Sequence, residues 1–311
     1  MPPRARGRFL LTFGFALMAF TLSAGAVQAG WLTRRNEQAA RQRAWIALRT
    51  RLHNRVNVFP GRVGLVVKDL RTGWEFSLDP DRRVAAASLI KIPMLGATFA
   101  AVRAGRLRLD DTLPLTAADR IGGSGVLKGR PVGTAVRVDE LLGLMIAHSD
   151  NAATNMLIRR LGFEWFDTWF ASARLSGTNL SRRMMDFTAR AHGVENYTTA
   201  ADVASVLEAL YRRRLVRSDL SELGLDWLKQ QYYHDRLPVL LPKGTVVANK
   251  TGLERRVCHD AGIVYTPAGD YLICVLTQHR DTTSRRSKRL IAHLSRDVYD
   301  YMVGASSSAS R

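Results

Sequence analysis

The chain has 311 residues, of which 46% are apolar, and this length fits one large domain or two closely packed subdomains. Only two cysteines occur, so a disulfide scaffold is excluded. The formal net charge is +19, yet the basic residues are scattered over predicted helix faces. A nucleic-acid-binding protein would need a basic stripe with interleaved aromatic residues, which the sequence lacks.

The first 29 residues have the composition of an export signal. Residues 1–8 carry three arginines, residues 9–22 are apolar, and residues 27–29 read Val-Gln-Ala, a small-x-small cleavage site. An uncleaved membrane anchor is the alternative, because residues 9–29 are almost long enough to span a bilayer. Polar residues and glycines within this stretch favour cleavage. We expect a periplasmic or secreted protein, with an Arg-rich surface that favours anionic envelope polymers.

Hydrophobic periodicity predicts the following elements in chain order. A helix over 33–57 is followed by a strand hairpin, 61–70 with 74–78, a helix over 85–104 and a loop-rich segment over 114–133. Helices are predicted over 138–148, 151–161, 163–173, 199–214 and 218–232, with a long ordered loop over 175–197. The chain closes with strands 245–251, 258–266 and 271–278 and a helix over 282–302.

This order predicts an α/β (α+β) fold with one antiparallel five-stranded sheet. The early and late strands pair, and the N- and C-terminal helices cover the sheet. Residues 30–80 and 245–311 then form an α/β domain, and residues 81–244 form an inserted all-helical domain, after a signal peptide over 1–29.

The two cysteines fall on the last predicted hairpin. If Thr266 pairs with Asp270, Cys258 lies opposite Gln278, and Cys274 is four residues away along the strand. Four residues span about 13 Å, which exceeds the limit of ~7 Å between the Cα atoms of a disulfide. We therefore predict two free thiols.

Three short strings stand out, in this order: Ser88-Leu89-Ile90-Lys91, Ser149-Asp150-Asn151 and Lys250-Thr251-Gly252. Ser-x-x-Lys alone is a weak signal. A specified triplet has on the order of 0.04 chance occurrences in a chain of this length, so two complete triplets in order are a strong signal.

The first string has the chemistry of an activated nucleophile. Ser88 and Lys91 lie one helical turn apart and project from one face. A serine hydroxyl needs a neighbouring base, and a desolvated lysine near other cations can act as one. Arginine cannot, because it stays protonated. The chain holds 39 arginines but only 7 lysines. Lysine at positions 91 and 250 therefore indicates a role that arginine could not fill.

The other two strings supply candidates for the oxyanion hole, for proton transfer and for substrate binding. Backbone N–H groups of Ser88 and Leu253 are candidates for an oxyanion hole. Ser149 is a candidate for relaying a proton to the leaving nitrogen, with Lys250 supporting it electrostatically. Each residue alone also has an ordinary reading: an N-cap, a polar turn or a surface charge. The substrate-binding candidates are Asn151 for an amide and Lys250, Thr251 and Gly252 for a carboxylate, whereas Asp150 is expected to form a structural cap.

With these strings, residues 40–303 resemble the class A β-lactamases and the class A-like penicillin-binding proteins of the serine β-lactamase-like superfamily. Ser149 favours the class A branch, because class C enzymes carry tyrosine at that position. The resemblance implies the fold described above with the active site between its two domains, and a β-lactam or a peptidoglycan stem peptide as substrate. We expect no cofactor and a monomer. The charge pattern argues against nucleic acid, and the seven scattered histidines, without an acidic partner at ligand spacing, argue against a metal.

The resemblance also suggests two further residues. Asn155 matches an asparagine that braces the Ω-loop in class A enzymes. His259 falls where many of these enzymes place an arginine that binds the substrate carboxylate. A strand histidine with a structural hydrogen bond is an equally good reading of His259.

The sequence departs from the family at the Ω-loop, which here lies within residues 175–197. Class A enzymes carry a glutamate on this loop that activates the deacylating water. Our alignment places Ala189 near that position, while Asp186 comes too early and Glu195 too late. A general base contributes roughly 10²–10⁴ in rate, so hydrolysis of an acyl-enzyme should be slowed.

Three functions remain open from the sequence. The first is a β-lactamase acylated at Ser88 that hydrolyses the β-lactam amide, with deacylation slowed. The second is a D-alanyl-D-alanine carboxypeptidase that lacks the Ω-loop glutamate. The third is a non-catalytic envelope-binding module, which the presence of Ser88, Lys91, Ser149 and Lys250 disfavours.

Overall fold

The computed structural model describes residues 12–281 and 283–307, with side chains for 35–281 and 283–304. The first element, α1 (Thr12–Asn57), is a single helix of 46 residues. Residues 1–11 of the expected signal peptide lie outside the described residues, and the rest of that segment belongs to α1. Within the described part of the chain, no helix is both long and apolar enough to cross a membrane.

The centre of the fold is one antiparallel sheet of five strands in the order β2-β1-β9-β8-β7. Its strands are β1 (Gly61–Asp69), β2 (Glu75–Leu78), β7 (Val247–Glu254), β8 (Val257–Val264) and β9 (Tyr271–His279). The early hairpin therefore pairs directly with the last strand, which confirms the predicted sheet.

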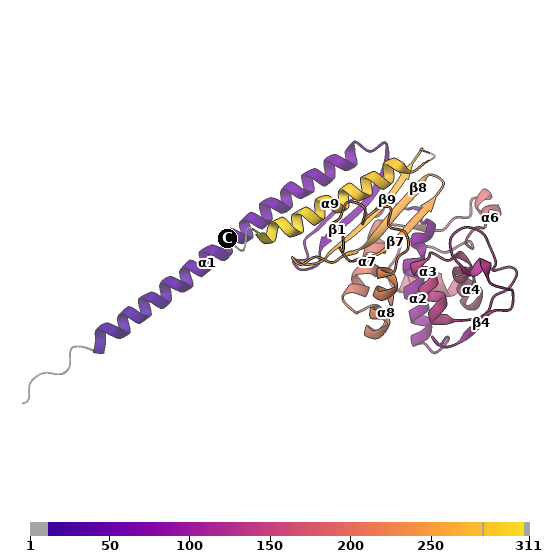
Figure 1. The fold of residues 1–311 in the computed structure, drawn as a ribbon, viewed down its shortest axis with the longest axis horizontal. Helices are drawn as coiled ribbons and strands as arrows, with labels where there is room; N and C mark the ends of the chain where they lie inside the picture. The colour runs from indigo at the N-terminus through magenta and orange to yellow at the C-terminus, as the bar shows by residue number, and fades with distance from the viewer. Residues whose placement is uncertain (1–11, 282, 308–311) are drawn as a thin grey trace, which may run out of the picture.

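Helices cover both faces of this sheet. One face packs against α1 and α9 (Arg285–Ser307), which run side by side (Figure 1). Leu48 of α1 and Ile291 of α9 are fully buried and pack with one face of β1 and β9. The opposite face packs against α7 (Ala200–Tyr211), whose N-cap is Thr199. Alternating strand residues thus enter two separate apolar cores.

The register of the last hairpin differs from the prediction by one residue. Cys258 lies opposite Thr277, not Gln278, and Cys274 lies opposite Ala261. The shift arises because β8 ends at Val264, which pairs with Tyr271, and leaves a longer turn than the sequence suggested. Both cysteines are buried and free, so the predicted absence of a disulfide is confirmed.

The remaining helices gather beside the sheet (Figure 1). They are α2 (Lys91–Arg103), α3 (Val138–Ala147), α4 (Asn151–Leu161), α5 (Phe163–Ser172), α6 (Phe187–Ala191) and α8 (Ser218–Lys229). Two short strand pairs join β3 (Val84–Ala85) with β6 (Tyr197–Thr198) and β4 (Thr112–Pro114) with β5 (Ala135–Arg137). A 3-10 turn, η2 (Leu127–Gly129), lies in the segment predicted as loop-rich.

Two predicted elements are more finely divided than the sequence indicated. The predicted helix over 85–104 begins as a 3-10 turn, η1 (Ala87–Ile90), before α2 starts. The predicted loop over 175–197 contains the short helix α6. Single-turn elements of this kind carry too few residues for a periodic pattern to show.

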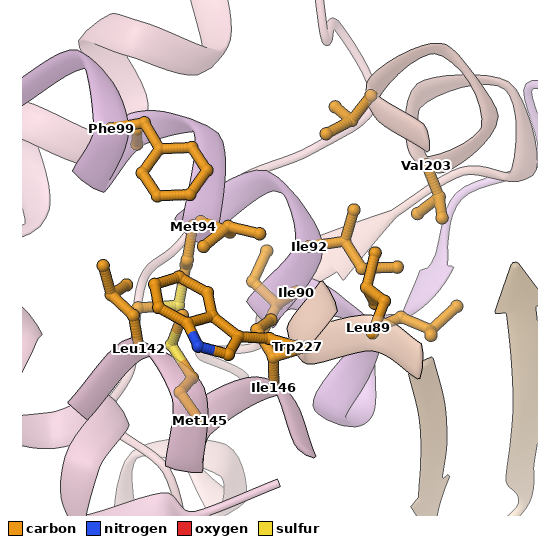
Figure 2. Packing of buried hydrophobic residues seen from close by; sticks show 14 of the residues in the cluster. Leu89, Ile90, Ile92, Met94, Phe99, Leu142, Met145, Ile146, Val203 and Trp227 are labelled. Carbon is orange, nitrogen blue, oxygen red and sulfur yellow. The ribbon is translucent and has the colours of Figure 1, made fainter. Parts of the chain in front are cut away.

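The core beside α2 fixes the turn that carries Ser88. Leu89, Ile90 and Ile92 are fully buried, and Trp227 of α8 lies among residues of α3 (Figure 2). The Trp227 ring centroid lies 6.1 Å from that of Phe99 on α2. Because apolar residues flank Ser88, the turn is anchored in the core while the serine side chain stays partly exposed.

Candidate active site

Ser88 lies on the turn between β3 and α2. The preceding residue, Ala87, has a left-handed backbone with φ of 46°, and the N–H of Leu89 donates to the Ala86 carbonyl at 3.0 Å. Ser88 and Lys91 therefore flank a tight turn that ends at the N-terminus of α2. The Nζ atom of Lys91 lies 3.2 Å from the Ser88 hydroxyl oxygen.

Lys91 is fully buried and surrounded by oxygen atoms. Besides Ser88, its Nζ donates to the Ser149 carbonyl at 2.7 Å, to the Asn151 side-chain oxygen at 2.9 Å and to the Ser149 hydroxyl at 3.1 Å. Burial lowers the pKa of Lys91 to about 7, against the opposing attraction of Asp150 and Glu254. A substantial fraction of Lys91 is thus neutral near pH 7, with a lone pair available for the Ser88 proton.

The Ser149-Asp150-Asn151 turn joins α3 to α4. Ser149 has a φ of 55°, a left-handed conformation that brings both its carbonyl and its hydroxyl to Lys91. Asn151 accepts from Lys91 and donates to the Gly122 carbonyl at 3.3 Å. Such a strained backbone is found where the surrounding structure fixes it, often at a functional site.

Asp150 is a structural centre of this turn. One of its oxygens accepts from the N–H of Ala153 and caps α4. The other accepts from the N–H groups of Val126 at 2.6 Å and Leu127 at 2.9 Å. The buried carboxylate therefore connects α4 to the loop that borders the site.

Lys250, Thr251 and Gly252 lie on β7, next to η1. Lys250 is fully buried, and its Nζ donates to the Thr251 carbonyl at 2.9 Å. Burial, together with repulsion from Lys91, lowers the pKa of Lys250 well below its usual value. A Cβ atom at Gly252 would lie 3.3 Å from the Ala86 carbonyl oxygen, so glycine lets β7 approach the serine turn closely.

His259 does not occupy the position expected of a carboxylate-binding residue. It is fully buried, its Nδ1 accepts from the N–H of Thr277 at 3.1 Å, and its Nε2 therefore donates to the Ala85 carbonyl at 2.9 Å. Burial lowers its pKa to about 4. A neutral ring with both nitrogens bonded to backbone cannot attract a carboxylate, so the substrate-binding expectation is corrected to a structural role beneath the site.

Asn155 holds the 175–197 loop beside the site. Its side chain bonds both backbone groups of Met184, accepting from the N–H at 2.9 Å and donating to the carbonyl at 3.3 Å. The next residue, Met185, reaches the site itself: a Cβ atom at Gly123 would lie 2.9 Å from its sulfur and 2.7 Å from the Asn151 amide nitrogen. Met185 and Asn151 therefore both border Gly123 at the edge of the site.

The carboxylates of this loop are all engaged elsewhere. Asp186 caps α6 through the N–H of Ala189, which places Ala189 in that helix. Glu195 accepts from the Arg182 side chain at 2.7 Å and lies 3.2 Å from Arg190. Among the described side chains, neither Asp186 nor Glu195 makes a hydrogen bond to Ser88, Lys91 or Ser149.

A network of two arginines and two glutamates connects the loop to β7. Arg182 and Arg190 bridge Glu195 of the loop and Glu254 at the end of β7, with contacts of 3.1 Å from Arg182 and 2.8 Å from Arg190 to Glu254. The Arg182 side chain is only 2% exposed, whereas that of Arg190 is 29% exposed. The sequence analysis missed this network, because Glu254 is 64 or more positions away from both arginines.

Replacing Arg182 with glutamine should loosen the 175–197 loop. Removing one partner from a buried ion pair costs about 3–5 kcal/mol, whereas the more exposed Arg190→Gln should cost roughly 1 kcal/mol or less. Hydrogen exchange of residues 181–196 should therefore increase strongly in Arg182→Gln and weakly in Arg190→Gln, with the sheet protected in both. Equal exchange in the two variants would show that the buried Arg182 does not hold the loop more strongly than Arg190.

The structure thus brings Ser88, Lys91, Ser149 and Asn151 into direct contact and places β7 alongside them. The side chains that the structure describes contain no group of three His, Cys, Asp or Glu residues that could hold a metal ion. A buried lysine beside a serine, with hydroxyl and amide groups converging on both, is the constellation of a serine hydrolase that uses lysine as its base.

Comparison with known proteins gives the family. The family model described as "Beta-lactamase enzyme family" matches residues 47–302, and the chain belongs to this family. A β-lactamase of Rhodobacter capsulatus is 34% identical over 173 residues, or 54% of this chain and 58% of that protein. The match thus spans little more than half of that relative's length.

Solved structures agree with this assignment. A β-lactamase from Sphaerobacter thermophilus is 30% identical with a TM-score of 0.74, covering 83% of this chain and 98% of that one. A leucine-to-glutamate mutant of PBP-A, solved as an acyl-enzyme complex with penicillin G, is 28% identical with a TM-score of 0.77, covering 83% and 97%. Both support the α/β fold described above.

Proposed function

We propose that this protein is an exported serine hydrolase that β-lactams acylate at Ser88 and that hydrolyses the resulting acyl-enzyme slowly. The observation that carries the proposal is the contact of 3.2 Å between the Ser88 hydroxyl and the fully buried Lys91 amine. The penicillin G acyl-enzyme of the PBP-A mutant supports acylation on this fold.

In the proposed acylation, neutral Lys91 takes the Ser88 proton as the serine oxygen attacks the β-lactam carbonyl carbon. The N–H groups of Ser88 and Leu253 stabilise the negative charge that develops on the carbonyl oxygen. The C–N bond then breaks, Ser149 gives its proton to the leaving nitrogen, and protonated Lys91 gives a proton back to Ser149. Its hydroxyl is well placed for this step because it already contacts Lys91 at 3.1 Å.

Substrate binding follows from the same elements. Asn151 offers its amide at the site, and Lys250 with Thr251 and Gly252 lies on the strand that borders a bound carboxylate. The positive charge of Lys91 disfavours a positive charge on Lys250 and lowers the pKa of Lys250. A substrate carboxylate near Lys250 would relieve this repulsion.

Slow deacylation follows from the 175–197 loop. Asp186 is held by a helix N-terminus and Glu195 by two arginines, and Met185 of the loop lies with Asn151 beside Gly123. A loop without a carboxylate in contact with Ser88 or Lys91 favours a second candidate, a D-alanyl-D-alanine carboxypeptidase that β-lactams inhibit. Both candidates share the acylation step and differ in how long the acyl-enzyme survives.

Time-resolved intact mass spectrometry after addition of penicillin G tests the proposal. We expect a single adduct on the wild-type chain that clears within minutes, and no adduct on Ser88→Ala. Persistence for hours would favour the carboxypeptidase, which release of D-alanine from a peptide ending in D-Ala-D-Ala would then support. An unchanged adduct on Ser88→Ala would exclude Ser88 as the nucleophile.

A further inference from the structure

A hollow with an arginine rim lies at one end of the sheet, outside the proposed active site. It forms where the start of β1, the end of β9 and the turn between β7 and β8 meet, since Gly61 pairs with His279 and Val257 with Gln278. Its volume is about 640 Å³. Its lining residues are Pro60, Gly61, Arg62, Arg256, Gln278, His279 and Arg280.

The rim carries an uncompensated positive charge. Arg62, Arg256 and Arg280 are exposed and come from three different segments of the chain. Within the side chains that the structure describes, no carboxylate pairs with any of these three. The nearby Asp281 lies 3.8 Å from Arg286, and Glu254 is held by Arg182 and Arg190.

His279 lies beside the rim but belongs to its buried floor. The residue is only 3% exposed, and its Nε2 lies 3.1 Å from the Ser284 hydroxyl. Its Nδ1 is also buried. The groups that the hollow offers to a ligand are therefore the three exposed arginines.

The positive surface continues beyond this hollow. A second hollow of about 410 Å³ shares Pro60 with the first and is lined by Arg286 and Arg289 of α9. Arg55 also lines it, but Asp297 pairs with Arg55 and Asp281 lies 3.8 Å from Arg286. Arg289 therefore adds positive charge next to the rim, and arginines spread over two adjoining hollows fit a chain of anionic groups better than a single ion.

We propose that the arginine rim, Arg62, Arg256 and Arg280, binds a linear phosphate-bearing polymer through guanidinium–phosphate contacts. Guanidinium groups match phosphate oxygens in a bidentate geometry. Arg256 lies in the turn that follows β7, four residues after Gly252. A polymer bound at the rim would therefore hold the enzyme with its active site close to that polymer.

The experiment measures binding of fluorescein-labelled polyphosphate to the full chain by anisotropy, in the absence of any β-lactam. The rim variant is Arg62→Gln/Arg256→Gln/Arg280→Gln. The control variant is Arg103→Gln/Arg174→Gln/Arg214→Gln, which removes the same charge from exposed arginines elsewhere. We expect about tenfold weaker binding for the rim variant, less than a threefold change for the control, and weaker wild-type binding at high salt.

Three results would overturn the proposal. Equal losses in both triple variants would show that only net charge matters. Equally tight binding of poly-glutamate would show that phosphate is not selected. Tighter rim-dependent binding to phosphatidylglycerol vesicles than to polyphosphate, at equal phosphate concentration, would assign the surface to a lipid headgroup instead of a polymer.

Discussion

Replacing Lys91 with arginine should slow acylation of Ser88 by about 10²–10⁴-fold, the usual contribution of a general base. Arginine keeps the positive charge but does not lose its proton. Lys91 is the group in contact with the Ser88 hydroxyl, and burial brings its pKa to about 7. The rate constant for adduct formation with penicillin G, measured by rapid mixing and intact mass, checks this expectation.

The pH dependence gives a second test that needs no mutation. Only the neutral amine accepts a proton, so acylation should fall as the pH decreases through about 7 and reach a plateau above it. Lys250→Arg keeps Lys91 as the base, so an inflection should remain, but the permanent charge of an arginine beside Lys91 should move it toward acid pH. If Lys91→Arg acylates within fivefold of the wild type, or if the wild-type rate rises toward acid pH, another group is the base.

The sequence was sufficient for the sheet and for the three strings, and the reasons are physical. Long amphipathic helices and alternating strands repeat their pattern over many residues, so periodicity identifies them. Ser88 and Lys91 are three residues apart, so their contact depends only on a local turn. The side-chain contacts of Ser149 and Asn151 with Lys91 join segments about 60 positions apart. They were not predicted, because the sequence assigned Ser149 to a proton relay with Lys250 and Asn151 to a substrate amide.

The parts that sequence reasoning missed depend on long-range packing. The tautomer and burial of His259 follow from its neighbours Ala85 and Thr277, which the strand pattern alone does not specify. The network of Arg182 with Glu195 and Glu254 joins a loop to a distant strand. The same holds for the arginine rim, whose members come from the start of β1, a turn and the end of β9.

Asp150→Ala should be among the most destabilising single substitutions in the chain. The substitution removes the acceptor of three N–H groups, those of Val126, Leu127 and Ala153. Leaving buried donors unpaired costs about 1–3 kcal/mol each, so a total of about 4 kcal/mol is expected, or roughly a 10 °C decrease in Tm. Thermal unfolding followed by circular dichroism measures it. A decrease below about 2 °C would show that the carboxylate does not hold this loop.

Asp150→Asn separates the charge of this residue from its capping role. An asparagine oxygen still accepts from the Ala153 N–H, so the loss of stability should be smaller than in Asp150→Ala. The negative charge of Asp150 raises the pKa of Lys91, in opposition to burial. Its removal should therefore lower the pKa of Lys91 and move the acylation inflection toward acid pH. An inflection that stays in place or moves toward alkaline pH would mean that Asp150 acts on Ser88 only through the structure of the turn.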